Sequence, residues 1–188
     1  MSKIAVIFHS GYGHTQRMAQ AVAAGAGSVA STELIAIDTE GNITDAAWAT
    51  LAAADAVVMG SPTYMGSVSW QFKKFADASS KVWFSMGWKD KIAAGFTNSA
   101  SMNGDKHSTL HYLFTLSQQH GMVWVGTGMM PASTKATERD ALNYLGSSAG
   151  AMAQSPSDAG VDEMPVGDLE TAKQFGARVA SMAARFNK

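Results

Sequence analysis

Hydrophobic and polar positions along the chain follow two different periods. Five short runs are apolar almost throughout, as expected for parallel strands that are covered on both faces. Between these runs apolar residues recur every three or four positions, which is the period of an amphipathic helix. The predicted strands are Lys3–Phe8, Glu33–Ile37, Ala56–Gly60, Ile92–Thr97 and Met122–Gly126, and the predicted helices are His14–Gly27, Ala46–Ala54, Ser67–Ala78, Lys106–His120 and a last one from about Asp168.

This strict alternation predicts an α/β fold, a doubly wound five-stranded parallel sheet in the order 2-1-3-4-5 with helices on both faces. We expect the 188 residues to form one domain, 1–188. An insertion at about 127–166 is too long for an ordinary loop, and such loops are usually functional or interfacial. Its large apolar residues predict a homo-oligomer, a dimer or a tetramer. They are Met129, Met130, Leu142, Tyr144, Leu145, Met152 and Met164.

The end of the first strand carries the strongest sign of function. It reads Ser10-Gly11-Tyr12-Gly13-His14-Thr15, and a helix follows at once. The first N–H groups of a helix lack partners and favour an anion, so this turn suits a phosphate group. Ser10 and Thr15 add hydroxyl groups, and His14 is favoured as a further contact. The same pattern is also typical of a strand–helix turn that binds nothing, and the loop alone leaves both interpretations open.

The details of this turn and the composition of the chain exclude several classes of function. The turn has neither the Gly-Lys-Ser/Thr ending of nucleotide-hydrolysing loops nor Gly-x-Gly-x-x-Gly, so neutral donors would hold a monophosphate. The absence of cysteine excludes thiol catalysis and disulfides, and a net charge of −1 gives no footprint for nucleic acid or an anionic membrane. We see no signal or membrane-spanning segment and expect a cytoplasmic protein. His107 and His111 have no further ligand at a suitable spacing, so we expect no metal site.

Two more polar loops follow strands that should end beside this turn. Gly60–Gly66 contains Pro62, Thr63, Tyr64 and Met65, and Thr97–Gly104 contains Asn98 and Ser99. Ligands of open α/β sheets bind at the carboxyl ends of the strands, where these loops converge. Neutral donors and an aromatic face suit a flat heterocycle, although turns favour such residues in any case. A phosphoacceptor receiver domain would need an acidic residue at the end of the first strand, and none is there.

On these motifs the chain resembles the flavodoxin-like NAD(P)H:quinone oxidoreductases, the tryptophan-repressor-binding-protein-type (WrbA-like) group. The resemblance covers nearly the whole chain and includes His120-Gly121-Met122-Val123 and Tyr144-Leu145-Gly146, which ordinary flavodoxins lack. The chain departs from the family at Tyr64-Met65, where many members have Arg-Phe, and at Ala100–Asn103, where many have glycines. These departures concern the nucleotide and flavin contacts.

The resemblance implies bound FMN, with NADPH or NADH as co-substrate and a quinone as acceptor. The FMN-binding residues would be Ser10, Gly11, Tyr12, Gly13, His14, Thr15, Pro62, Thr63, Tyr64, Met65, Thr97, Asn98, Ser99, Gly104 and His120. Tyr12, Trp83 and His120 would contact the substrate, and no side chain is assigned as an acid–base catalyst. The resemblance also implies tetramers with flavin sites near subunit boundaries.

The function we predict is two-electron transfer from NAD(P)H to quinones through FMN. Two alternatives remain, a flavodoxin-type electron carrier and a non-catalytic FMN-binding module. A carrier would use a strongly acidic face to meet basic partners, which a net charge of −1 disfavours.

Overall fold

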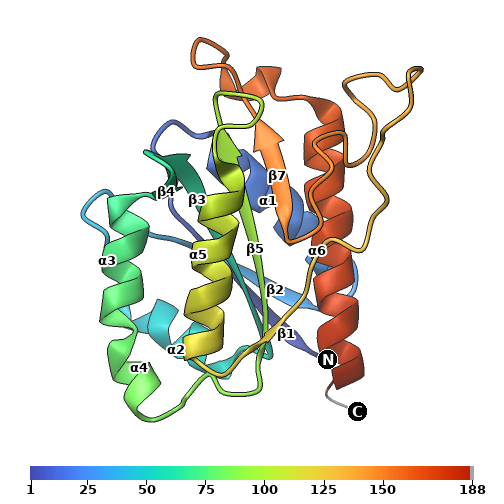
Figure 1. Cartoon of the computed structure of the whole chain (residues 1–188). Coiled ribbons are helices and arrows are strands. Elements are labelled where there is room, and N and C mark those ends of the chain that lie inside the picture. Colours follow the sequence, from blue (N-terminus) through green and yellow to red (C-terminus); the bar gives the residue numbers. More distant parts are fainter. Residues whose placement is uncertain (187–188) are drawn as a thin grey trace.

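A computed structural model describes residues 1–186 and contains a parallel sheet between two layers of helices (Figure 1). The strands are β1 (Lys3–Phe8), β2 (Ser31–Ala36), β3 (Ala56–Tyr64), β4 (Ser67–Val68), β5 (Ile92–Ser99), β6 (Val123–Trp124) and β7 (Ala151–Gln154). The helices are α1 (His14–Gly27), α2 (Asp45–Ala53), α3 (Trp70–Ala78), α4 (Ser80–Phe84), α5 (Lys106–Gln119) and α6 (Val166–Phe186), with a short 3₁₀ turn at Val161–Glu163. No helix within 1–186 is long and apolar enough to cross a bilayer.

The strand order β2-β1-β3-β5-β6 confirms the predicted topology, because β5 and β6 are the fourth and fifth strands of the prediction. All of these pairs are parallel, so the carboxyl ends of β1, β3 and β5 lie at one edge of the sheet. The predicted strand at Met122–Gly126 is shorter in the structure, and β7 resumes the same edge further along β5. The fifth strand is therefore split into two parts.

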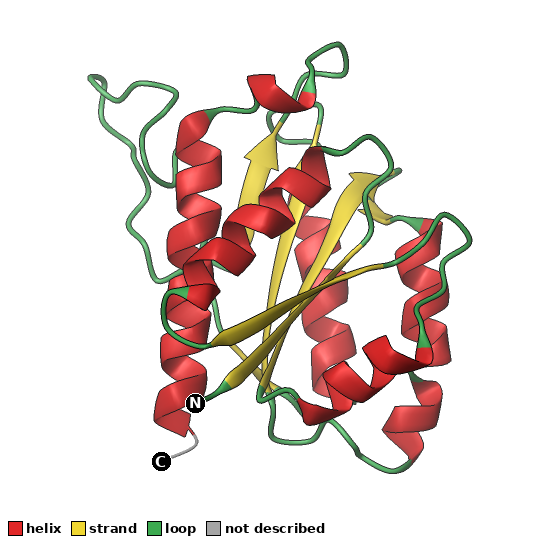
Figure 2. Ribbon diagram, turned by 180° about the vertical axis from the view of Figure 1, so that it is seen from behind, coloured by secondary structure: helices red, strands yellow, loops and turns green. Residues whose placement is uncertain are grey.

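Each face of the sheet has its own core, because side chains of a strand alternate between the faces. Ile4, Val6 and Phe8 of β1 pack with α1 and α6, which lie in front in Figure 2. Ala5 and Ile7 pack on the other side with α2, α3 and α5. The near-continuous apolar strands of the sequence follow from this burial on both faces.

Helices α1 and α6 approach closely because glycines lie where they cross. A Cβ on Gly25 would collide with the backbone of Lys173, and a Cβ on Gly176 would collide with the Val22 carbonyl. The backbones therefore meet without intervening side chains, which fixes α6 against the helix that follows the phosphate-type turn.

Two local predictions were wrong. Ser67–Val68 is not helical but forms β4, antiparallel to the end of β3, and α3 begins at Trp70 with Ser69 as its N-cap. The predicted insertion at 127–166 ends early, because 151–154 returns to the sheet as β7. Several of its apolar residues are also used within the chain: Met164 is buried, and Met129 and Met152 pack against the core.

The α1–α6 contact gives a stability prediction. Gly176→Ala should destabilise the protein by about 1–3 kcal/mol, the usual cost of overpacking, because the helices must move apart. Gly27→Ala is the matched control, since a Cβ there meets nothing within 4 Å. Urea midpoints of the two variants measure the difference, and equal midpoints would contradict the close contact.

Candidate functional site

The largest group of predicted site residues surrounds one cavity at the carboxyl end of the sheet. Its volume is about 540 Å³, within the usual range for small-molecule sites. Three of its walls come from the carboxyl ends of β1, β3 and β5 and the loops that follow them, as expected from the topology, and the fourth comes from 155–161. The lining residues are Tyr12, His14, Pro62, Thr63, Tyr64, Asn98, Ser99, Ala100, Ser155, Pro156, Ser157, Ala159, Gly160 and Val161.

The first wall is the turn between β1 and α1. Gly13 adopts φ +91°, and its N–H donates a hydrogen bond to Ser10 Oγ at 3.1 Å. Helix α1 has no side-chain cap and no acidic residue in its first turn, so its N-terminal N–H groups remain available to an anion. Thr15 is 2% exposed, and its hydroxyl takes part in none of the side-chain hydrogen bonds found within residues 1–186. Neutral donors at this turn thus suit an anion, and Thr15 adds a hydroxyl group beside them.

The second wall comes from the end of β3, where Tyr64 reaches across to the first loop. Its hydroxyl lies against Gly11, so that a Cβ on Gly11 would collide with it. The ring meets Tyr12 edge to face, with centroids 6.4 Å apart. Burial raises the pKa of Tyr64, so the phenol stays neutral at physiological pH. Two aromatic rings thus line this part of the cavity, and Tyr12 is 80% exposed.

Three threonine hydroxyl groups hold the second wall in place from its buried side. Thr63 Oγ1 lies 2.8 Å from Thr97 Oγ1 and 2.8 Å from Thr109 Oγ1. Thr97 and Thr109 are completely buried. Thr97 therefore fixes Thr63 rather than lining the cavity itself.

Met65 stands apart from the cavity at the tip of the β3–β4 hairpin. Met65 and Gly66 both have positive φ, +48° and +77°, as a two-residue type I′ hairpin turn requires. The Met65 side chain is fully exposed and lines a shallow neighbouring hollow with Trp70.

The third wall is the loop after β5, and it rests on a buried lysine whose only signal in the sequence was its place at the start of a helix. Lys106 Nζ donates hydrogen bonds to Ser99 Oγ at 2.8 Å, to the Ser101 carbonyl at 3.0 Å and to the Met102 carbonyl at 2.7 Å. Burial lowers the pKa of Lys106 to about 8. Gly104 closes the loop at φ +56°, where a Cβ would collide with Ser99 Oγ.

The fourth wall, 155–161, was not predicted as part of the site. Ser155 Oγ donates to Asn98 Oδ1 at 3.0 Å, and His14 Nε2 donates to the Ala159 carbonyl at 3.0 Å. Val161 packs on Gly13, and Arg17 pairs with Asp162 at 2.9 Å on the surface. The segment is thereby fastened over the first loop. No residue motif indicated this, because its contacts are with residues more than 50 positions earlier.

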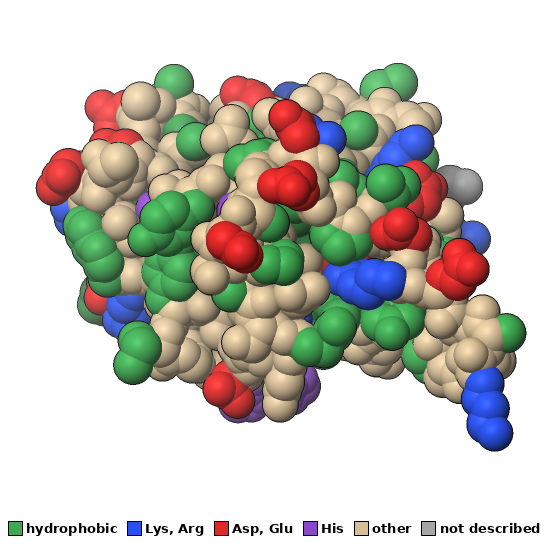
Figure 3. Space-filling model, turned by 90° about the horizontal axis from the view of Figure 1, so that it is seen from above, with side chains coloured by type: hydrophobic (Ala, Val, Ile, Leu, Met, Phe, Trp, Pro, Cys, Tyr) green, Lys and Arg blue, Asp and Glu red, His purple; other side chains and the backbone are tan. Residues whose placement is uncertain are grey.

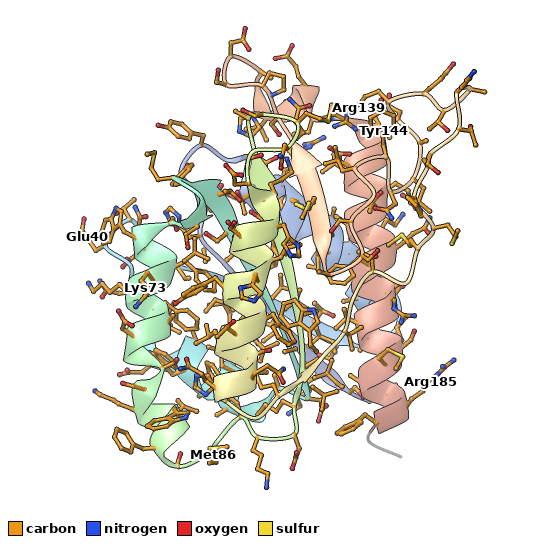
Figure 4. The ribbon with its side chains drawn as sticks, in the orientation of Figure 1. Glu40, Lys73, Met86, Arg139, Tyr144 and Arg185 are labelled. Carbon is orange, nitrogen blue, oxygen red and sulfur yellow. The ribbon has the colours of Figure 1, made fainter. Side chains whose placement is uncertain are left out.

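His120 and Trp83 do not lie at this cavity, contrary to the placement expected for them. The 14 residues of α5 carry the chain about 21 Å away from the strand ends before His120 is reached. Both residues line a smaller cavity of about 220 Å³ at the opposite end, the end where Figure 4 shows Met86. His120 Nε2 lies 2.9 Å from Ser79 Oγ, its ring lies on Trp88, and burial lowers its pKa.

The chemistry of the cavity fits FMN. None of the lining residues is Asp, Glu, Lys or Arg, so hydroxyl, amide and aromatic groups face a ligand. The uncapped N-terminus of α1 and the buried Thr15 hydroxyl suit a phosphate at one end. Within residues 1–186, no group of three His, Asp or Glu side chains is placed to hold a metal ion.

Comparisons with known proteins agree with this chemistry. The model of the NADPH-dependent FMN reductase family matches residues 2–137. Flavodoxin FldP of Pseudomonas aeruginosa is 54% identical over the full length of both chains, and an NAD(P)H dehydrogenase (quinone) of Rhizobium rhizogenes is 33% identical over 98% of each. The structure of a WrbA-like flavodoxin from Agrobacterium tumefaciens is 52% identical, with a TM-score of 0.81, covering 98% of this chain and 99% of that one. The predicted family and cofactors, FMN with NAD(P)H as donor, are confirmed.

The first wall gives a binding prediction. Thr15→Ala removes a hydroxyl that would hydrogen-bond a charged phosphate, worth roughly 1.5–3 kcal/mol, so FMN affinity should fall by about one to two decades. Thr15→Ser keeps the hydroxyl and should bind nearly as the natural protein does. Calorimetric titration of the apoproteins is the measurement, and equal affinity for the Ala variant would remove Thr15 from the phosphate site.

Proposed function

The chain belongs to the NADPH-dependent FMN reductase family, in its WrbA-like group, and we propose that it transfers two electrons from NAD(P)H to quinones. The observation that carries this proposal is the uncharged cavity flanked by two tyrosine rings beside a phosphate-type turn. Flat, neutral acceptors suit such a cavity better than charged ones. Relatives named NAD(P)H dehydrogenase (quinone) that cover nearly the whole chain support the same acceptor class.

In this proposal each wall has a separate task. The Ser10–Thr15 turn and the N-terminus of α1 hold the phosphate of FMN, with His14 beside them. Thr63, Asn98 and Ser99 offer hydrogen bonds to the polar parts of the cofactor, with Pro62 and Gly104 shaping their loops. Bound FMN supplies the two-electron chemistry between nicotinamide and quinone. The protein positions the reactants, and no side chain is required as an acid or base.

The surface around the cavity supports an apolar acceptor. Tyr12, Met65, Trp70 and Met102 are each more than half exposed at or near this end of the molecule. Figure 3, which views that end from above, shows hydrophobic side chains gathered beside mixed charges. Exposed apolar side chains at the same end of the molecule as a neutral cavity favour small planar molecules over a highly charged partner.

A flavodoxin-type electron carrier is the second candidate, because the relative at 54% identity is named flavodoxin. Carriers meet basic partner proteins through acidic faces, and a net charge of −1 gives little basis for one. The two functions differ in one property. A carrier needs a separate reductase, whereas the proposed enzyme is reduced by NAD(P)H alone. The need for NAD(P)H also favours the cytoplasm as its compartment.

Self-association belongs to the same proposal. In one chain Trp83 and His120 lie at the end opposite the cavity, so a role for them at a substrate site requires a second copy of the chain. Met130 and Leu142 of the insertion and Phe84 of α4 remain exposed and available to an interface. The substrate role of Trp83 and His120 therefore depends on a dimer or tetramer.

The activity has a direct kinetic test. NADPH or NADH should bleach the visible absorbance of the FMN-loaded protein rapidly without another protein, and benzoquinone should restore it. Steady-state rates should follow ping-pong kinetics, because nucleotide and quinone would use the same cavity in turn. Slow bleaching that becomes fast with an added flavodoxin reductase would instead identify the carrier, and intersecting double-reciprocal lines would contradict a shared cavity.

The assembly has its own test. Sedimentation at micromolar concentration should give a dimer or a tetramer rather than the 19.7 kDa monomer. In such an assembly Trp83→Ala should raise the KM for quinone while leaving FMN affinity unchanged. A single monomeric species would exclude both Trp83 and His120 from the substrate site.

A further inference from the structure

Lys106 is a buried positive charge directly behind the loop that forms the third wall of the cavity. It is 1% exposed, which is rare for a lysine, and it is the first residue of α5. A cation is unfavourable at a helix N-terminus, where the dipole is positive. Burying Lys106 and placing it at a helix N-terminus both cost free energy, so we expect this residue to have a role that compensates for the cost.

All three ammonium hydrogens of Lys106 are used by this loop. They go to Ser99 Oγ, which lines the cavity, and to the carbonyls of Ser101 and Met102. These acceptors are neutral, so they satisfy the hydrogen bonds without cancelling the charge. The loop that faces the ligand is therefore bound to a cation from behind.

The buried acidic group that acts on Lys106, Asp168, is largely neutralised by another partner. Asp168 is 2% exposed and is held by Arg139 through two hydrogen bonds of 2.8 and 2.7 Å. The group of Lys106, Asp168 and Arg139 therefore has one net positive charge. Since burial lowers the pKa of Lys106 only to about 8, the ammonium is mostly protonated at pH 7.

This charge matters because the redox states of the cofactor differ in charge. Two-electron reduction of FMN adds two electrons and one or two protons, so the ring system becomes anionic when only one proton is taken up. A nearby cation in a protein interior favours the more negative state. An uncharged side chain at the same place would lose this discrimination and keep only the hydrogen bonds.

We propose that Lys106 is a positioning residue that sets the reduction potential of the flavin site, holding the Ser99–Met102 turn and favouring reduced over oxidised FMN by its charge. The inference rests on the proposed FMN site. It assigns to Lys106 an electrostatic role in addition to its hydrogen bonds. The electrostatic role and the hydrogen bonds can be tested separately, because the first depends on the charge of the side chain and the second depends on its N–H donors.

Lys106→Gln keeps N–H donors without the charge, Lys106→Met loses both, and Lys106→Arg keeps the charge. Lys91→Met is the matched control, because Lys91 Nζ also binds backbone carbonyls (those of Ala52 and Ala54) but lies at the amino-terminal end of β5. Circular dichroism establishes that each variant is folded. Dissociation constants of oxidised FMN come from titration, and midpoint potentials come from dithionite reduction against a reference dye.

Lys106→Gln and Lys106→Met should each weaken the binding of reduced FMN at least tenfold more than the binding of oxidised FMN. For a two-electron couple, a tenfold difference lowers the midpoint potential by about 30 mV. Lys106→Arg and Lys91→Met should leave the potential unchanged. Two results would overturn the electrostatic role and make Lys106 structural. Either Lys106→Gln keeps the midpoint potential of the natural protein, or all Lys106 variants lose affinity for oxidised and reduced FMN equally. If the unaltered protein binds no FMN, the proposed function fails instead.

Discussion

One carboxylate, that of Asp168, joins three parts of the chain: α6, the insertion, and β7, the strand that leads into the fourth wall of the cavity. It lies in the first turn of α6, where a negative charge is favourable, and it receives a bidentate pair from Arg139 of the insertion. It also accepts the backbone N–H of Gln154 at the end of β7 at 2.9 Å. Figure 4 shows Arg139 next to Tyr144 at the upper end of α6, and the guanidinium lies 5.1 Å from the centre of that ring. This carboxylate therefore adds to the β5 pairing that holds β7, the strand that leads into the 155–161 wall.

Most of the fold could be predicted from the sequence, because burial on both faces imposes apolar strands and helical periodicity separately on each element. The bounds of β1 and α1 were predicted correctly, and the parallel order followed from the alternation. The split of the fifth strand could not be predicted in this way. The residues of β7, Ala-Met-Ala-Gln, have no strong strand preference, and their pairing with Phe96–Ser99 depends on β5 being present.

The candidate site likewise has parts that could be predicted from the sequence and parts that could not. Loops after β1, β3 and β5 converge because parallel strands end together, and the alternation of strands and helices is enough to infer this. The wall at 155–161, the buried Lys106 and the distance of His120 from the cavity depend on tertiary contacts. A histidine before glycine at a helix end looks the same in sequence whether the helix points toward a ligand or away from it. The direction of α5 decides this, and α5 runs from the cavity toward the opposite end.

The insertion, residues 127–150, interrupts an edge strand of the sheet, and this position leaves the cavity undisturbed. Edge strands lose few hydrogen bonds when they are interrupted, and the break lies beside Gly95, between the residues that pair with β6 and those that pair with β7. Gly150 approaches the Gly95 carbonyl so closely that a Cβ would collide with it, and the Trp124 indole donates to the Ala149 carbonyl at 2.8 Å. Thr127 Oγ1 closes the base of the insertion by donating to the Ser147 carbonyl at 2.8 Å. The chain thus leaves and re-enters the sheet at nearly the same point, and β7 delivers 155–161 to the first loop as an uninterrupted strand would.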